Sequence, residues 1–81
     1  MNVRVKLFAA VRDIVGKDEI ILPASPGATA SSLLIDLARR YPELGKWTES
    51  VRVAVNWEYV PNSQLLNDND EVAVIPPVSG G

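Results

Sequence analysis

The chain has 81 residues, with 8 basic and 10 acidic side chains, a net charge of −2 at neutral pH, and neither cysteine nor histidine. These absences exclude disulfide bonds, Ser-His-Asp and Cys-His catalytic sites, and the nitrogen and sulfur ligand sets of zinc, haem and iron-sulfur centres. The acidic balance argues against nucleic acid or an anionic membrane as the main partner, and a hydrophobic content of 47% favours one domain stabilised by packing alone.

A β-strand is the first predicted element. Val3, Val5 and Leu7 alternate with polar residues, which is typical of a strand with one buried face. Phe8 falls in the opposite register, with Arg4, so it is either covered by the next element or exposed as an aromatic anchor. The alternation differs from the continuous apolar region of a signal peptide, and no apolar run could span a bilayer, so we expect a cytoplasmic protein.

A short helix and a second strand follow. The apolar residues of 9–15 share one side at helical spacing, and Gly16 suits the left-handed position after a helix. The aliphatic residues of 19–22 then predict a strand that Pro23 closes.

The longest predicted helix begins after a turn at Pro26-Gly27. Thr29 is the expected N-cap, although Ser32 replaces the Glu or Gln of a full capping box. The helix has one apolar stripe, made by Leu33, Leu34, Leu37, Ala38 and Tyr41. Pro42 should stop further winding soon after the stripe.

Three short strands complete the predicted elements. Alternating valines predict a strand over 51–55, and Asn56-Trp57 turns the chain into a partner over 58–60, although Trp57 disfavours the positive φ of a tight hairpin. After a polar loop and a tight turn at Asp68-Asn69-Asp70, residues 72–75 are apolar on both faces and should lie inside the sheet.

This order of elements favours an α+β fold in which the first and last strands are parallel neighbours. The long helix then packs across one face of a mixed sheet of about five strands, as in the β-grasp (ubiquitin-like) architecture. A ferredoxin-like sandwich would need a second long helix, which the sequence lacks. We expect a β-grasp domain over residues 1–75 and an extended, flexible Gly-Gly tail over residues 76–81.

Acidic residues are the remaining conventional acid-base groups. Asp68, Asp70 and Glu71 are close in sequence, and carboxylates can bind a hard cation. The ligand series and the glycine of an EF-hand loop are missing, so we interpret these residues as a turn and predict no metal site.

The carboxyl-terminal segment is the strongest candidate for chemistry. It consists of Pro76, Pro77, Val78, Ser79, Gly80 and Gly81. Six extended residues reach about 20 Å, enough to enter a deep site on another protein, and glycines at the tip allow close approach in a narrow channel. The terminal carboxylate of Gly81 can attack the α-phosphate of ATP on a partner enzyme. The resulting acyl-adenylate can become a thiocarboxylate, a thioester or an amide, and Gly-Gly alone does not choose between them.

Three internal segments and the tail carry a family resemblance. They are Leu7-Phe8-Ala9-Ala10-Val11-Arg12-Asp13-Ile14-Val15-Gly16, Val55-Asn56, Asp68-Asn69-Asp70-Glu71-Val72-Ala73 and Pro76-Pro77-Val78-Ser79-Gly80-Gly81. Together they resemble the small subunit of molybdopterin synthase across nearly the whole chain. Asp13 stands where that family often has glutamate, Asn69 where it usually has glycine, and Trp57 replaces a more turn-friendly residue.

The resemblance implies a β-grasp sulfur carrier that has no catalytic site of its own. An adenylating, E1-like enzyme would activate Gly81 with ATP, a persulfide donor would supply sulfur, and the Gly81 thiocarboxylate would enter the large subunit of the synthase. There the sulfur would pass to cyclic pyranopterin monophosphate during molybdenum cofactor biosynthesis. The family is usually a heterotetramer of two small and two large subunits, and the small subunit binds no permanent cofactor. By analogy, Phe8, Tyr59 and Ile75 would form a docking face with Arg12 as a polar contact.

Three alternatives stay open at this point. A related carrier could serve another pathway, such as thiamine synthesis, with the same chemistry and a different acceptor. A ubiquitin-like modifier would be joined to lysines through Gly81. A plain interaction domain would carry an idle tail.

Overall fold

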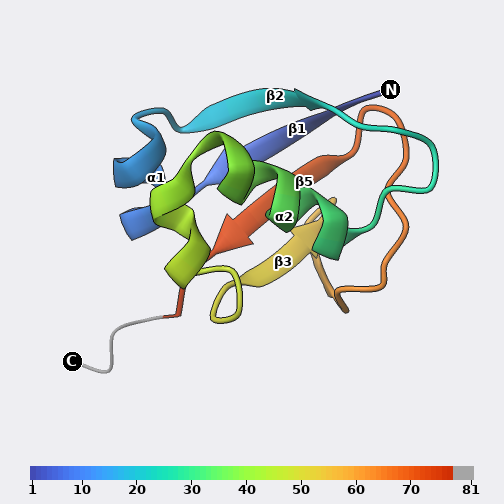
Figure 1. The fold of residues 1–81 in the computed structure, drawn as a ribbon. Coiled ribbons are helices and arrows are strands. Elements are labelled where there is room, and N and C mark those ends of the chain that lie inside the picture. The colour runs from blue at the N-terminus through green and yellow to red at the C-terminus, as the bar shows by residue number, and fades with distance from the viewer. Residues whose placement is uncertain (78–81) are drawn as a thin grey trace.

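The computed structural model describes residues 1–77 as a five-stranded mixed sheet with one long helix across a face (Figure 1). The elements in chain order are β1 (Asn2–Leu7), α1 (Ala9–Val15), β2 (Glu19–Pro23), α2 (Ala30–Arg40), the 3-10 helix η1 (Pro42–Lys46), β3 (Arg52–Val55), β4 (Glu58–Val60) and β5 (Glu71–Ile75). The strand order across the sheet is β2-β1-β5-β3-β4. Within these residues, no helix is long and apolar enough to cross a membrane.

The last strand, β5, lies in the middle of the sheet between β1 and β3 (Figure 1). It runs parallel to β1, with Val5 opposite Val72, and antiparallel to β3, with Val53 opposite Val74. A strand in this position has a hydrogen-bonded neighbour at each edge. Val72 and Val74 face the core, and Ala73 on the other face is only 7% exposed, which accounts for its run of apolar residues. The predicted parallel pairing of the first and last strands is confirmed, and with α2 crossing the sheet this is the β-grasp architecture.

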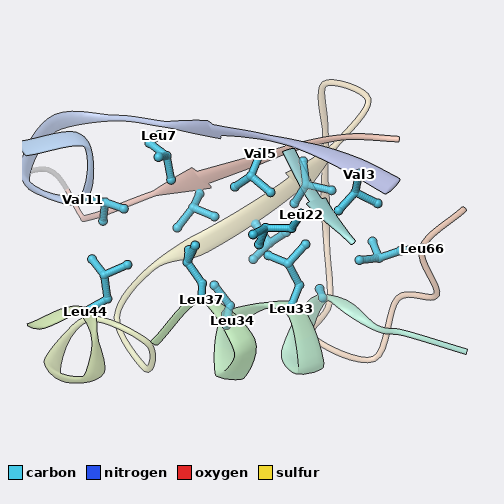
Figure 2. Close-up of a cluster of buried hydrophobic side chains, with 14 residues drawn as sticks. Val3, Val5, Leu7, Val11, Leu22, Leu33, Leu34, Leu37, Leu44 and Leu66 are labelled. Atoms are coloured by element: carbon cyan, nitrogen blue, oxygen red, sulfur yellow. The ribbon is translucent and has the colours of Figure 1, made fainter. Parts of the chain in front are cut away.

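The core lies between α2 and one face of the sheet. Figure 2 shows Leu33, Leu34 and Leu37 of α2 pointing toward the sheet, where Val3 and Val5 are fully buried. Each buried aliphatic side chain contributes about 1.5 to 3 kcal/mol relative to exposure. The other two members of the predicted helix stripe, Ala38 and Tyr41, are half-buried at its margin.

Reciprocal hydrogen bonds between Thr29 and Ser32 fix the start of α2. Thr29 Oγ1 accepts from the Ser32 N–H at 3.1 Å, and Ser32 Oγ accepts from the Thr29 N–H at 2.8 Å. Ser32 therefore completes the capping box that the sequence pattern had left without its Glu or Gln. The helix ends at Arg40, but the prediction that Pro42 stops further winding is wrong. Pro42 is the first residue of the 3-10 helix η1, a position where the missing N–H of proline costs no hydrogen bond. The buried side chain of Leu44 anchors that extra turn.

Left-handed backbone conformations shape two turns. The predicted hairpin between β3 and β4 is confirmed, with φ angles of 50° at Asn56 and 73° at Trp57. Asn69 has a φ of 66°, as its place in the Asp68-Asn69-Asp70 turn predicts. The conformation is unusual for a bulky residue such as Trp57, because a Cβ in this region approaches the following carbonyl oxygen and costs about 1 to 2 kcal/mol.

Candidate functional site

The predicted reactive arm starts where β5 ends. Ile75 is half-buried, Pro76 is buried and Pro77 is exposed. Neither proline has an N–H to extend the sheet ladder, so the central strand ends at Ile75 and the predicted arm begins there. The rest of the predicted arm lies outside the described residues: Val78, Ser79, Gly80 and Gly81.

The sheet surface opposite α2 is here called the outer face. The arm begins at the end of this face where Ile75 lies opposite Arg52. Strand register arranges the side chains of the face in three rows. The row nearest the arm pairs Ile75 with Arg52, and Phe8, whose backbone is still extended, follows Leu7 on the same side of the chain as Arg4 and Lys6. The second row holds Glu19, Lys6, Ala73, Ala54 and Tyr59, and the third holds Ile21, Arg4 and Glu71. The predicted docking residues Phe8, Tyr59 and Ile75 therefore share one surface, on rows next to the arm.

Phe8 follows the last residue of β1 and is the N-cap of α1. Its backbone is still extended, with φ −128° and ψ 152°, and its carbonyl oxygen accepts from the N–H groups of Val11 and Arg12 at 3.1 and 3.2 Å. The chain then turns at Ala9, which has a positive φ of 49°. Phe8 is 38% exposed, so α1 leaves part of this residue open to solvent. Of the two alternatives for this residue, the exposed one is correct, while its role in binding stays a prediction.

Two aromatic side chains of the β3–β4 hairpin lie against basic residues of the outer face. The Tyr59 ring is 58% exposed, with the Arg52 guanidinium carbon 4.0 Å from its centroid. The Trp57 ring is 74% exposed, and the Lys6 ammonium is 5.3 Å from its centroid. Such cation–π contacts contribute about 0.5 to 1 kcal/mol at exposed sites. They hold both rings beside the sheet.

Two alanines form the floor between these aromatic residues. Ala54 and Ala73 are register partners at the centre of the second row, and only 6% and 7% of their surfaces are exposed. Their small side chains keep the middle of the face shallow, while Lys6 and Tyr59 stand on either side in the same row. The outer face is therefore a shallow apolar surface bordered by cations.

Charge on the outer face is opposite in sign to that of the whole chain. Its strand residues include three basic side chains, Arg4, Lys6 and Arg52, against the acidic Glu19 and Glu71. The carboxylate of Glu71 lies 3.8 Å from a guanidinium nitrogen of Arg4 and 3.5 Å from the Lys6 ammonium, and its side chain is only 13% exposed. The cationic groups of the face consequently outnumber the acidic groups that a partner can reach.

Arg12, the predicted polar contact, lies in the last turn of α1. Its guanidinium is 3.9 Å from the carboxylate of Asp18, and both side chains are more than half exposed. An exposed pair of this kind contributes about 0 to 1 kcal/mol. Arg12 can therefore exchange Asp18 for a partner's carboxylate at little cost.

The carboxylates of the Asp68-Asn69-Asp70 turn, which were considered as metal ligands, accept hydrogen bonds instead. Asp70 is buried and accepts from Asn56 Nδ2 at 2.9 Å and from the Asn67 N–H at 2.7 Å, while Asp68 accepts from the Asn2 N–H at 2.8 Å. Across residues 1–77, no group of three acidic side chains is placed to hold a metal ion. The interpretation as a turn is confirmed, with Asp70 as its buried acceptor.

Sequence reasoning missed part of this surface. The sequence pattern marks Trp57 only as an unfavourable turn residue, and it singles out neither Lys6 nor Arg52 as a contact. The signal was present in the strand alternation, since the residues that alternate with buried valines along a strand must face outward. What alternation did not provide was the order of the strands, which decides that these outward residues become neighbours.

Comparisons with known proteins cover the arm as well as the domain. Residues 5–81 match the ThiS family. The molybdopterin synthase sulfur carrier subunit of Dictyostelium discoideum is 42% identical over 96% of this chain and 94% of its own length. A solved structure from Pyrococcus furiosus, a putative molybdopterin converting factor subunit 1, has a TM-score of 0.86 at 32% identity, covering 96% of this chain and 99% of that one. SAMP1 from Haloferax volcanii has a TM-score of 0.88 at 26% identity, covering 100% of both chains.

Proposed function

The chain belongs to the ThiS family, and from this premise we propose that it is the sulfur-carrier subunit of a molybdopterin synthase. The nearly full-length similarity to a protein of that name carries the proposal, and the region that matches the ThiS family includes the Gly-Gly end. Placement of the arm's start on the central strand supports it, since the terminal carboxylate can then reach into a partner while the domain stays folded.

The chemistry of this proposal takes place at the Gly81 carboxylate. A carboxylate oxygen attacks the α-phosphorus of ATP on an adenylating enzyme, and pyrophosphate leaves. A protein persulfide then attacks the acyl carbon and displaces AMP, and a second thiol reduces the sulfur–sulfur bond to release the thiocarboxylate. Cysteine is absent from all 81 residues, so the persulfide and the reducing thiol of these steps belong to partners.

The outer face is the docking surface in this proposal. The large subunit covers Phe8, Tyr59 and Ile75, with Arg12 as a polar contact, while Pro76 and Pro77 direct the arm into its active site. Exposed aromatic rings on a rigid sheet suit this role, because they provide contact area at a low cost in conformational entropy. The sulfur is then transferred to the pterin precursor inside the large subunit.

Intact-mass measurement tests the proposal. The protein is incubated with its adenylating enzyme, ATP and a persulfide donor, and then with the large subunit and cyclic pyranopterin monophosphate. Exchange of one oxygen for sulfur at Gly81, followed by loss of that sulfur as dithiolene product forms, is the expected result. An unchanged carboxylate in the complete system would contradict it.

A second candidate function is conjugation to other proteins. The likeness to SAMP1 favours it, since related structures carry the name small archaeal modifier protein 1. The same activated Gly81 would then form an amide with a lysine instead of a thiocarboxylate. Ladders of higher-mass conjugates in cells that express the tagged protein, lost when Gly81 is deleted, would support this function and distinguish it from sulfur transfer.

A further inference from the structure

Trp57 occupies an unfavourable position for its residue type. Its φ of 73° places a bulky side chain in a region that suits glycine, at a hairpin turn where Asn-Gly is the best sequence. Its ring nevertheless gains little burial, since 74% of it remains exposed. Packing within residues 1–77 therefore does not explain a tryptophan here, and a strained, exposed aromatic residue indicates a role outside the domain.

The Trp57 ring continues the outer face on the side away from the arm. Lys6, which stands 5.3 Å from the ring centroid, belongs to the second row together with Tyr59 and the alanine floor. Ile75 lies in the row nearest the arm, and Phe8 is on the same face. A partner that covers these residues and extends one row further would reach Trp57.

The charges of the face indicate what kind of partner fits it. A second copy of this chain would bring the basic side chains Arg4, Lys6 and Arg52 against their own counterparts, with Glu71 already paired to two of them. Like charges in an interface are unfavourable, so the occupant should carry carboxylates. The rest of the contact area is apolar and aromatic, which favours a folded protein surface.

We infer that Trp57 is a specificity-determining contact for the large subunit, and that the matching surface of that subunit is apolar with carboxylates opposite Arg52 and Lys6. This inference rests on the proposed function. The tryptophan extends the docking face beyond the residues next to the arm. The two-residue turn imposes the unfavourable backbone conformation, and the tryptophan at that place serves the contact with the partner.

The test uses a substitution that relaxes the turn while removing the ring. Trp57→Gly gives the Asn-Gly sequence that a tight hairpin prefers, so the melting temperature should rise while affinity for the purified large subunit falls about tenfold in calorimetric titration. Asn69→Gly is the matched control, because it relaxes a positive φ in another turn and should leave affinity unchanged. Ile35→Ala removes an exposed aliphatic side chain of α2 and should also leave affinity unchanged.

Charge complementarity is tested in the same titration. Affinity of the unaltered protein should fall as salt is raised from about 50 to about 200 mM, and Arg52→Glu should weaken binding most at low salt. An affinity independent of salt, or strengthened by Arg52→Glu, would overturn the assignment of carboxylates. Dimerisation of the chain alone in sedimentation, abolished by Trp57→Gly, would overturn the assignment of the partner.

The outcomes separate this inference from the function beneath it. If the unaltered protein binds the large subunit and delivers sulfur, but Trp57→Gly binds within about twofold of it, the inference is wrong and the proposed function stands. If the unaltered protein neither binds the large subunit nor delivers sulfur, both are wrong.

Discussion

Asn56 donates its backbone N–H to the carbonyl oxygen of Glu71 at 2.8 Å, and its side-chain Oδ1 accepts from the Glu71 N–H at 3.1 Å. The Asn56 side-chain oxygen thus takes the place of a backbone carbonyl oxygen, which the Glu71 N–H would have bonded if β3 were one residue longer. Asn56 Nδ2 also donates to the buried carboxylate of Asp70. Asn56 therefore attaches the hairpin that carries Trp57 to the central strand.

Removing that amide should destabilise the domain. Asn56→Ala leaves the Glu71 N–H and one oxygen of Asp70 without a side-chain partner, and it puts alanine in a left-handed conformation, so the free energy of unfolding should fall by about 2 kcal/mol. Urea denaturation measures the change. Asn62→Ala, at an exposed position in the following loop, is the control and should shift it by less than about 0.5 kcal/mol.

The capping box should show coupling between its two members. Thr29→Ala and Ser32→Ala each remove a side-chain partner of the first turn of α2 and should each lower stability by about 1 kcal/mol. Because the two bonds are reciprocal, the double variant should lose less than the sum of the single losses. Ser31→Ala serves as the control within the same turn. Strictly additive losses would contradict a cooperative box.

Phe8 should matter more for binding than for folding. Phe8→Ala removes a ring that is already 38% exposed, so the melting temperature should change little, while affinity for the large subunit should fall about tenfold or more. Leu7→Ala provides the contrast, since its side chain is buried and its loss should chiefly lower stability. A large fall in the melting temperature of Phe8→Ala without loss of affinity would instead indicate a packing role.

One residue added after Gly81 should abolish activation. The added residue moves the carboxylate away from the position where it meets ATP, while residues 1–77 contain the whole described core. Thermal melting should therefore be unchanged, and the ATP-dependent release of pyrophosphate should be lost. Normal sulfur loading of the extended protein would exclude Gly81 as the reactive residue.

Alternation and spacing were sufficient to predict the sheet. Buried valines at every second position located β1 and β3, and the run at 72–75, apolar on both sides, identified β5 as an interior strand. These patterns are strong because each follows directly from which faces are covered. The 3-10 helix η1 was not predictable in this way, since only Leu44 of its five residues is buried. One apolar residue alone cannot show the spacing by which a helix or a strand is identified.

The candidate site was predictable only in part. The alternation of residues along β1 was enough to predict that Phe8 faces outward. The composition of the last six residues was enough to predict the arm. The contact between Lys6 and Trp57 was not predictable, because it joins residues from β1 and the β3–β4 turn that become neighbours only through β5. Leu65 and Leu66 make the same point: adjacent in a polar loop, the first is exposed and the second is buried.

The central position of β5 has a mechanical consequence. A pull on Pro77 along the strand loads the hydrogen bonds to β1 and β3 together, in shear, whereas a pull on an edge strand would peel its bonds away one at a time. The sheet therefore resists a pulling force best at the start of the arm, where partners in the proposed function would hold the protein. A partner that held the arm would therefore pull against both neighbouring strands at once.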